Sequence, residues 1–274
     1  MARLDFHPRA FFAGCLSLLV AVPSLCEGSW ESTVSPFPPG PFSELRPTRV
    51  HYNFGWNGLT AATAELHLTR TANGRFRLES TGGTIGLTRA LWKLDAKNTS
   101  VSDAQTLRPI QSREIESRRS KTLETEVNYT PDGVTSRREE RRGPSLKTKT
   151  QSFEFPNVLS LNSAMLYLRA RPLPDGAVER IVVYPATSAY LCTITVLGRE
   201  RITGPTGTAD AIKLDFQLSK IGKQRELLPH KKFKRATAWV SDDADRLILR
   251  IEAQIFIGTV YAELQSVKFE NGKR

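Results

Sequence analysis

The alternation of apolar and polar residues with period two is the feature that most constrains the fold of this chain. The apolar residues of the first such segment are Val50, Tyr52, Phe54 and Trp56. Side chains of an extended strand point alternately to the two faces of a sheet, so the pattern predicts a strand with one buried face. Asn57-Gly58 follows at once, and this dipeptide is a strong signal of a two-residue hairpin turn.

The same alternation returns along most of the chain, near residues 62–68, 76–80, 181–196, 212–218, 236–240 and 247–264. Asn73-Gly74 predicts a second hairpin turn, and Pro131-Asp132-Gly133 predicts a turn between strands 122–129 and 134–141. Short turns between such strands favour antiparallel neighbours. The fold class predicted is therefore mainly β, with a large antiparallel curled sheet or incomplete β-barrel.

One stretch, residues 157–173, breaks this rhythm. Its apolar residues recur at helical spacing, and they are Val158, Leu161, Met165, Leu166 and Leu168. Asn157 or Ser160 is available as the N-cap, and Pro172 ends the pattern. We predict one helix, at about 157–171, that flanks or plugs the sheet. Residues 84–95 fit either a short helix or a strand.

The N-terminus has the order of a secretory signal peptide. A basic start is followed by the apolar run 10–22 and then by Pro23-Ser24. The domain prediction is a signal peptide at 1–28, a proline-rich linker at 29–47, a single β-rich domain at 48–268 and a C-terminal tail at 269–274. It implies an exported protein, periplasmic or associated with the cell envelope. A buried N-terminal helix or an anchor is the alternative, and lipidation at Cys15 or Cys26 stays open.

The chain is basic, with 39 Lys and Arg against 28 Asp and Glu, a formal net charge of +11. This balance favours anionic partners, namely anionic lipid, an amphiphile or an envelope polysaccharide, or it serves only solubility. Export argues against nucleic acid as a partner. The residues proposed to contact an anionic surface are Lys220, Lys223, Arg225, Lys231, Lys232, Lys234 and Arg235. A solvated loop is the alternative for this segment.

Few residues suggest chemistry. After loss of the leader the histidines are His51, His67 and His230, well apart in sequence, and no metal, nucleophile or phosphate-binding motif is present. We therefore assign no catalytic residue, no metal and no cofactor. Residues 242–245, Asp-Asp-Ala-Asp, favour a turn over a calcium site. The residues proposed to bind a ligand are Tyr52, Trp56 and Trp239, although packing is the commoner use of such a tryptophan.

The segments that carry a family resemblance are residues 42–45 (FSEL), 51–58 (HYNFGWNG), 163–169 (SAMLYLR), 172–176 (PLPDG), 239–243 (WVSDD), 246–248 (RLI) and 258–264 (GTVYAEL). Together they resemble the bacterial family of unknown function numbered 3108, over about residues 42–267. The family often has proline where this chain has Ile248, and isoleucine suits a strand better. The resemblance implies an exported, β-rich envelope protein, and it implies no activity.

We therefore expect an exported, non-catalytic envelope protein that binds a lipid or another amphiphile on a concave sheet face. Small inward residues would leave room for such a ligand or would permit close packing instead, and they are Ala62, Ala64, Ala236 and Ala238. The alternatives are a hydrolase or lyase acting on envelope polymers, using His51 with a nearby acid, and an assembly partner that uses basic hairpins. Enzymatic activity is left uncertain.

Overall fold

The computed structural model describes residues 29–36, 45–229, 235–255 and 258–270. The predicted signal peptide, with Cys15 and Cys26, lies outside the described residues, as do residues 37–44 of the predicted linker. The elements, in chain order, are η1 (Trp30–Thr33), β1 (Thr48–Trp56), β2 (Leu59–Arg70), β3 (Arg75–Thr84), α1 (Gly86–Leu91), β4 (Leu94–Asp103), β5 (Pro109–Arg118), β6 (Lys121–Thr130), β7 (Gly133–Arg142), β8 (Ser145–Glu154), α2 (Leu161–Arg169), β9 (Val178–Val183), β10 (Tyr190–Gly204), β11 (Gly207–Ile221), β12 (Leu227–Pro229), β13 (Arg235–Ser241), β14 (Ile248–Ile255) and β15 (Gly258–Phe269). Within these ranges no helix is long and apolar enough to cross a membrane.

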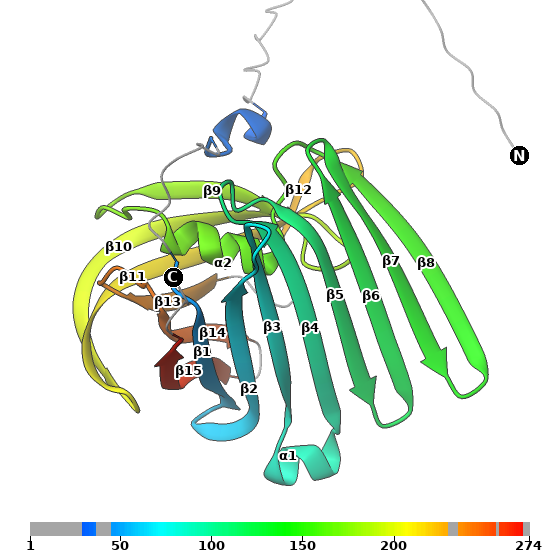
Figure 1. The fold of residues 1–274 in the computed structure, drawn as a ribbon, viewed down its shortest axis with the longest axis horizontal. Helices are drawn as coiled ribbons and strands as arrows, with labels where there is room; N and C mark the ends of the chain where they lie inside the picture. The colour runs from blue at the N-terminus through cyan, green and yellow to red at the C-terminus, as the bar shows by residue number, and fades with distance from the viewer. Residues whose placement is uncertain (1–28, 37–44, 230–234, 256–257, 271–274) are drawn as a thin grey trace, which may run out of the picture. The chain divides into compact units, whose positions relative to one another are not determined.

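One 15-stranded antiparallel sheet accounts for nearly the whole unit formed by residues 33–274 (Figure 1). The strand order is β8-β7-β6-β5-β4-β3-β2-β1-β15-β14-β13-β11-β10-β9, with β12 paired to β11. The first long strand, β1, pairs with the last, β15, in the interior of this order. The sheet stays open because β8 and β9 are its two ends. This confirms the prediction of a mainly β, incomplete barrel.

Helix α2 carries the chain from the β8 end of the sheet to the β9 end (Figure 1). It starts at Ser160, whose Oγ accepts a 3.0 Å hydrogen bond from the Ser163 amide. Five of its nine residues are buried, because the sheet curls around the helix and covers more than one of its sides. The predicted helix is confirmed, with Ser160 rather than Asn157 as its N-cap.

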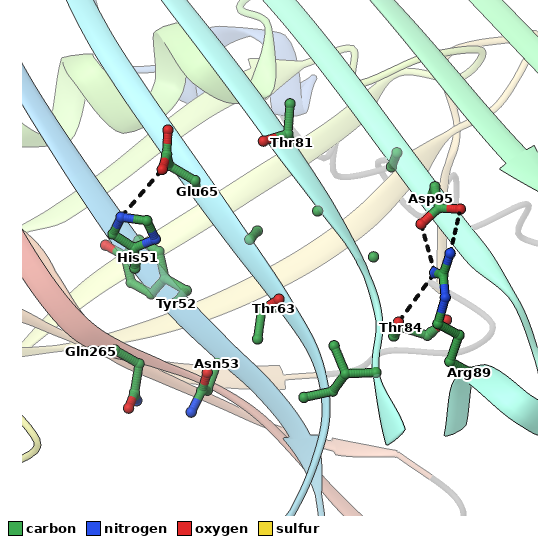
Figure 2. A pocket seen from close by; sticks show the side chains of 15 residues that line it. His51, Tyr52, Asn53, Thr63, Glu65, Thr81, Thr84, Arg89, Asp95 and Gln265 are labelled. Atoms are coloured by element: carbon green, nitrogen blue, oxygen red, sulfur yellow. Dashed lines mark hydrogen bonds and ion pairs between the residues drawn. The ribbon is translucent and has the colours of Figure 1, made fainter. Parts of the chain in front are cut away.

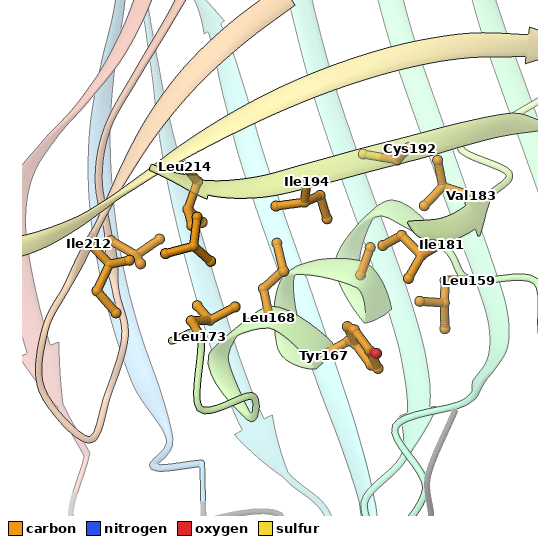
Figure 3. Close-up of a cluster of buried hydrophobic side chains, with 13 residues drawn as sticks. Leu159, Tyr167, Leu168, Leu173, Ile181, Val183, Cys192, Ile194, Ile212 and Leu214 are labelled. Carbon is orange, nitrogen blue, oxygen red and sulfur yellow. The ribbon is translucent and has the colours of Figure 1, made fainter. Parts of the chain in front are cut away.

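The two faces of the sheet differ in what they carry. The helix face is the side that packs on α2, and it bears Val50, Leu68 and Ile194; the opposite side is called the outer face. Figure 3 shows the main core cluster, in which Leu168 of α2 meets residues of β9, β10 and β11. Leu45, in the predicted linker, is 4% exposed and packs in a second cluster on this face.

Tyr184, just after β9, links the two ends of the sheet. Its carbonyl accepts a 2.7 Å hydrogen bond from the Tyr129 hydroxyl on β6, and its own hydroxyl lies 2.9 Å from Ser136 Oγ on β7. These buried contacts hold the β9 end over the helix face of β6 and β7. The curl is therefore fixed by side chains where backbone pairing stops.

Residues 84–95, which fitted either a helix or a strand, contain both. The short helix α1 spans Gly86–Leu91, and β4 begins at Leu94. None of the residues of α1 is buried, and its N-cap residue, Ile85, makes no side-chain capping bond. Two contacts hold the segment: Thr84 Oγ1 donates to the Trp92 carbonyl at 2.9 Å, and Arg89 forms an ion pair with Asp95 at 2.6 Å.

Candidate functional site

A narrow crevice lies on the helix face between α2 and strands β1–β3, with a volume of about 60 Å³. Tyr52 lines it, and the Tyr52 hydroxyl donates a 2.8 Å hydrogen bond to the carbonyl of Ile248. The aliphatic and methionine side chains of the lining are those of Val50, Leu66, Leu68, Leu78, Met165, Leu166, Leu247 and Ile248. A surface of this kind excludes water and suits the apolar part of a ligand.

Arg169, the last residue of α2, supplies the charge in this lining. Its Nε donates a 2.7 Å hydrogen bond to the main-chain carbonyl of Asp245. Its Nη2 is buried and has no hydrogen-bond partner among the described residues. Burial lowers the pKa of Arg169, but arginine starts so high that the guanidinium stays charged at neutral pH. A buried N–H without an acceptor is costly, and an anionic oxygen would satisfy it.

The nearest acidic residue, Asp245, is occupied by another arginine. Arg46 Nε donates to Asp245 Oδ1 at 2.9 Å, and Arg46 Nη2 bonds the other carboxylate oxygen. Asp245 is only 8% exposed, so this pairing holds its charge in a largely buried position. Arg46 therefore bonds both oxygens of the Asp245 carboxylate. Arg169 is hydrogen-bonded only to the main-chain carbonyl of Asp245, although the carboxylate charge also acts on Arg169.

Small residues continue the helix face beyond the crevice. By register, Tyr52 on β1 lies opposite Ala64 on β2, Ala64 lies opposite Gly82 on β3, and Gly82 lies opposite Ala96 on β4. Ala64, Gly82 and Ala96 are half-buried, so this part of the face is not sealed by the core. We call these three residues the small-residue floor.

The four small residues singled out in the sequence divide between two settings. Ala62 and Ala64, on β2, are both half-buried. Ala64 is part of the small-residue floor, and Ala62 lies two residues before it on the same strand. Ala236 and Ala238, on β13, are 5% and 2% exposed. Room for a ligand therefore exists beside β2, whereas β13 uses its alanines for close packing.

An open hollow of about 810 Å³ lies over β1–β4 (Figure 2). Its lining includes outer-face residues such as His51 and Glu65, and also Tyr52 and the small-residue floor. The hollow exists partly because Gly82 and Gly83 lack side chains; a Cβ on Gly83 would meet the carbonyl oxygen of Leu94 at 2.9 Å. Arg89 and Asp95 stand at one side, and the hydrogen bond from Arg89 lowers the pKa of Asp95. The hollow is therefore lined by both polar and apolar groups and is wide open to solvent.

A histidine and a carboxylate meet in this hollow, as the hydrolase alternative requires. His51 Nε2 lies 3.3 Å from Glu65 Oε2 (Figure 2). Arg49 pairs with the other oxygen of Glu65. His67 lies on the same face and contacts Glu270 at 2.9 Å. The side chain of His51 is 49% exposed, so the hollow does not exclude water as hydrolytic sites do when they stabilise a developing charge. No hydroxyl or thiol is hydrogen-bonded to His51 among the described residues.

The three aromatic residues proposed as ligand contacts do not form one site. Tyr52 is buried in the crevice, and Trp56 stands at the end of β1 with 41% of its surface exposed. Trp239 lies on the outer face, where its Nε1 donates to Glu200 at 2.5 Å and Lys213 sits over its ring. Only Tyr52 belongs to the crevice.

Four of the seven basic residues proposed for an anionic surface lie among the described residues. Lys231, Lys232 and Lys234 lie outside the described residues. Lys220 and Lys223 are exposed. Arg225 donates to the Glu154 carbonyl at 2.9 Å, and Arg235 pairs with the buried Asp215. The two arginines thus have structural partners on their own chain.

Two smaller features are the acidic segment at residues 242–245 and Cys192. Asp243 Oδ1 accepts hydrogen bonds from the amides of Asp245 and Arg246 at 2.9 and 3.0 Å, so residues 242–245 form a turn. Cys192 is buried, and burial raises the pKa of its thiol to about 12. The described residues contain no group of three or more potential metal ligands.

Sequence reasoning missed Arg169 as a candidate contact. It lies in the family-like segment 163–169 and at the end of a predicted helix, where a basic residue ordinarily interacts with the helix dipole. Only the fold buries its guanidinium against an apolar crevice.

Three comparisons place the chain among known proteins. The family model described as "Protein of unknown function (DUF3108)" matches residues 49–265. No curated protein matches the sequence. The crystal structure of a β-barrel-like protein of the domain of unknown function DUF1849 from Brucella abortus is similar in fold, with a TM-score of 0.55, 9% identity, and coverage of 83% of this chain and 99% of that chain.

Two further solved structures align with lower scores. A protein from Bacteroides fragilis described as exported, with a YmcC-like fold, has a TM-score of 0.36 and 9% identity, and the match covers 83% of this chain and 98% of that one. A protein from Parabacteroides distasonis described as a lipoprotein has a TM-score of 0.35 and 10% identity, with 83% and 97% coverage. At 9% identity the Brucella abortus structure informs on the fold alone.

Proposed function

This chain belongs to the DUF3108 family of proteins of unknown function, and we propose that it is an exported, non-catalytic envelope protein that binds an anionic amphiphile on its helix face. The head group, a carboxylate or phosphate, would bind Arg169 in the crevice. The apolar tail would lie along the small-residue floor. Export rests on the N-terminal order of basic residues, apolar run and Pro23.

The single observation that carries the proposal is the unsatisfied Nη2 of Arg169 in an apolar crevice. Buried polar groups in native proteins nearly always have partners, so an orphaned guanidinium N–H needs an explanation. A ligand oxygen supplies one. Charge-assisted bonds from arginine to carboxylate or phosphate are among the strong hydrogen bonds in proteins.

The size of the crevice divides the ligand into two parts. Its volume of about 60 Å³ is far below the roughly 300–1,000 Å³ typical of sites that enclose a whole small molecule. It therefore suits a head group but no long tail. The neighbouring floor of Ala64, Gly82 and Ala96 offers a half-buried strip for the tail.

A chain-matched pair of ligands tests the proposal. We expect palmitate to displace a fluorescent fatty-acid probe from the wild-type protein, and hexadecanol, which has the same chain without the charge, to do so at least about tenfold more weakly. Arg169→Met should remove this preference while keeping the apolar contacts. Arg201→Met, at an exposed ion pair on β10, is the matched control.

Two results would contradict the proposal: no displacement by either ligand, or an unchanged carboxylate preference in Arg169→Met. Thermal unfolding of each variant shows whether the fold is kept. If Arg169→Met does not fold, Arg169→Lys, which keeps the charge but loses the planar fork, should weaken palmitate binding and leave hexadecanol binding unchanged.

A further inference from the structure

One rim of the sheet exposes an unusual number of large apolar side chains. They lie in the β1–β2 turn and around α1, and they are Trp56 (41% exposed), Leu59 (70%), Ile85 (37%), Leu87 (77%), Leu91 (76%) and Trp92 (55%). We call these six residues the apolar rim. They lie at the lower ends of the strands in Figure 1, where β1–β2 and β3–β4 turn. Scattered exposed leucines need no explanation, but a contiguous set indicates an interaction site.

The apolar rim is contiguous because its two parts are bonded together. Trp56 pairs with Leu59 across the β1–β2 turn. The Ile85 amide donates a 3.0 Å hydrogen bond to the carbonyl of Ala61, two residues into β2. Leu87 and Leu91 are four residues apart on α1, so they share one side of that helix. The side chains therefore project from adjacent turns of one edge.

Basic residues border the apolar rim on the side of β5–β8. The next turns along the same edge, β5–β6 and β7–β8, carry Arg119, Arg141 and Arg142, all exposed. Arg119 Nη2 donates to the Ala90 carbonyl of α1 at 2.7 Å, which fixes a cation directly beside the leucines. Over residues 84–95, 116–122 and 140–147 the edge has eight basic and three acidic residues, a net charge of +5.

The three acidic residues of this edge are already paired. Asp95 bonds Arg89, Glu116 bonds Arg118, and Glu140 bonds Lys121, at 2.6, 2.6 and 3.1 Å. The net charge of the edge is therefore carried by the five other basic residues, which are Lys93, Arg119, Arg141, Arg142 and Lys147. An apolar strip bordered by cations complements an anionic bilayer, which has acyl chains beneath a layer of negative head groups.

We propose that this edge docks the protein onto an anionic membrane surface, with the apolar rim inserted among the head groups and the basic residues beside it bound to lipid phosphates. Tryptophan is enriched at the membrane interface, and two of the six rim residues are tryptophans. Long basic side chains bury their stems while their charges reach the head groups. This edge lies apart from Arg169 and from residues 220–229, where Arg225 bonds the carbonyl of Glu154 at the far end of β8, so the inference does not depend on the proposed amphiphile site.

Co-sedimentation with vesicles tests the docking edge. We expect the wild-type protein to bind vesicles of phosphatidylcholine mixed with phosphatidylglycerol, to bind pure phosphatidylcholine vesicles much less, and to be released from the mixed vesicles at high salt. Leu87→Asp/Leu91→Asp should weaken binding by more than about a hundredfold. Arg141→Ser/Arg142→Ser should weaken it by about thirtyfold.

Matched controls separate docking from folding. Leu161→Asp exposes the same new charge at a leucine that is 58% exposed on α2, and it should bind as the wild type does. Arg201→Ser is the control for the arginine pair. The rim leucines are exposed, so we expect their variants to fold, and unfolding curves verify this. Arg169→Met should keep vesicle binding even where amphiphile binding is lost, which distinguishes the two proposals.

Three outcomes would overturn the docking edge: no binding of the wild type to mixed vesicles, equal binding by Leu87→Asp/Leu91→Asp, or equal binding to neutral and anionic vesicles. A concentration-dependent dimer that the leucine variant abolishes, seen by light scattering without vesicle binding, would assign the apolar rim to a second copy of the chain instead.

Discussion

The two helices of the sheet, α2 and α1, are held in different ways. α2 has a side-chain cap at Ser160 and buries five of its nine residues, whereas α1 has six residues, none buried, and no such cap. A helix of six residues is not stable by itself, so α1 depends on the strands at its ends and on the Arg89–Asp95 pair. Packing explains Leu166 and Leu168 of α2, which are 4% and 8% exposed. It does not explain Leu87 and Leu91, and their exposure indicates a role outside folding.

The largest expected difference between the two helices is the change in unfolding free energy when a leucine of each is replaced by alanine. Leu166→Ala in α2 deletes a side chain that is 4% exposed and should lower the free energy of unfolding by about 2–5 kcal/mol. Leu87→Ala in α1 removes a side chain that is 77% exposed and should change it by no more than about 0.5 kcal/mol. Urea denaturation followed by circular dichroism measures both. Equal losses would mean that α1 is part of the core after all.

Loss of the α2 cap should lower the free energy of unfolding by less than loss of a buried leucine. Ser160→Ala removes the 3.0 Å bond to the Ser163 amide and should cost about 1 kcal/mol of unfolding free energy. Thr88→Ala, on the α1 surface, is the matched control and should stay within about 0.5 kcal/mol of the wild type. A Ser160→Ala variant as stable as the wild type would show that α2 is held by packing alone.

The smallest effect is the pH dependence of the ion pair on α1. The hydrogen bond from Arg89 lowers the pKa of Asp95, so the fold favours the ionised carboxylate. Its contribution to stability is present above the unfolded pKa of about 3.9 and is lost as the pH falls through the lower folded pKa. Both groups are exposed, so the effect on stability is small.

A chemical-shift titration of the Asp95 carboxyl group measures this directly. We expect a midpoint below that of an ordinary aspartate in the wild type and a return towards about 3.9 in Arg89→Gln. Arg77→Gln, which disrupts a different exposed pair with Glu79, should leave the Asp95 midpoint unchanged. An Asp95 midpoint that does not respond to Arg89→Gln would remove Arg89 as the cause.

Some features of the fold were visible because they are local. Asn57-Gly58 supplies two successive positive φ angles, 45° and 82°, that a tight hairpin turn needs. Ser160 precedes an apolar run at helical spacing, so the sequence already contains the cap and the face of α2. Along β13, Trp239 alternates with Ala238 and Val240, so its side chain points to the other face of the sheet. This alternation is visible in the sequence and indicates that Trp239 does not share a site with Tyr52.

The candidate sites were not visible in this way. Arg169 is an ordinary helix-end arginine until the sheet curls over it, and Leu87 looks like a core leucine until α1 is placed at the edge. Whether a side chain is buried depends on which segments pack against it, and those segments can be far apart in sequence. The pairing of β1 with β15 is an example.

The sequence by itself determined the strand rhythm, the hairpin turns and the helix that crosses between the sheet ends, because side-chain alternation and capping act over a few residues. The pairing of β1 with β15, the orphaned guanidinium of Arg169 and the exposed leucines of α1 were decided by tertiary structure alone. Each depends on long-range contacts that bury one side chain and leave a similar one in water. The free energy gained by burial is therefore set only when the whole sheet has formed.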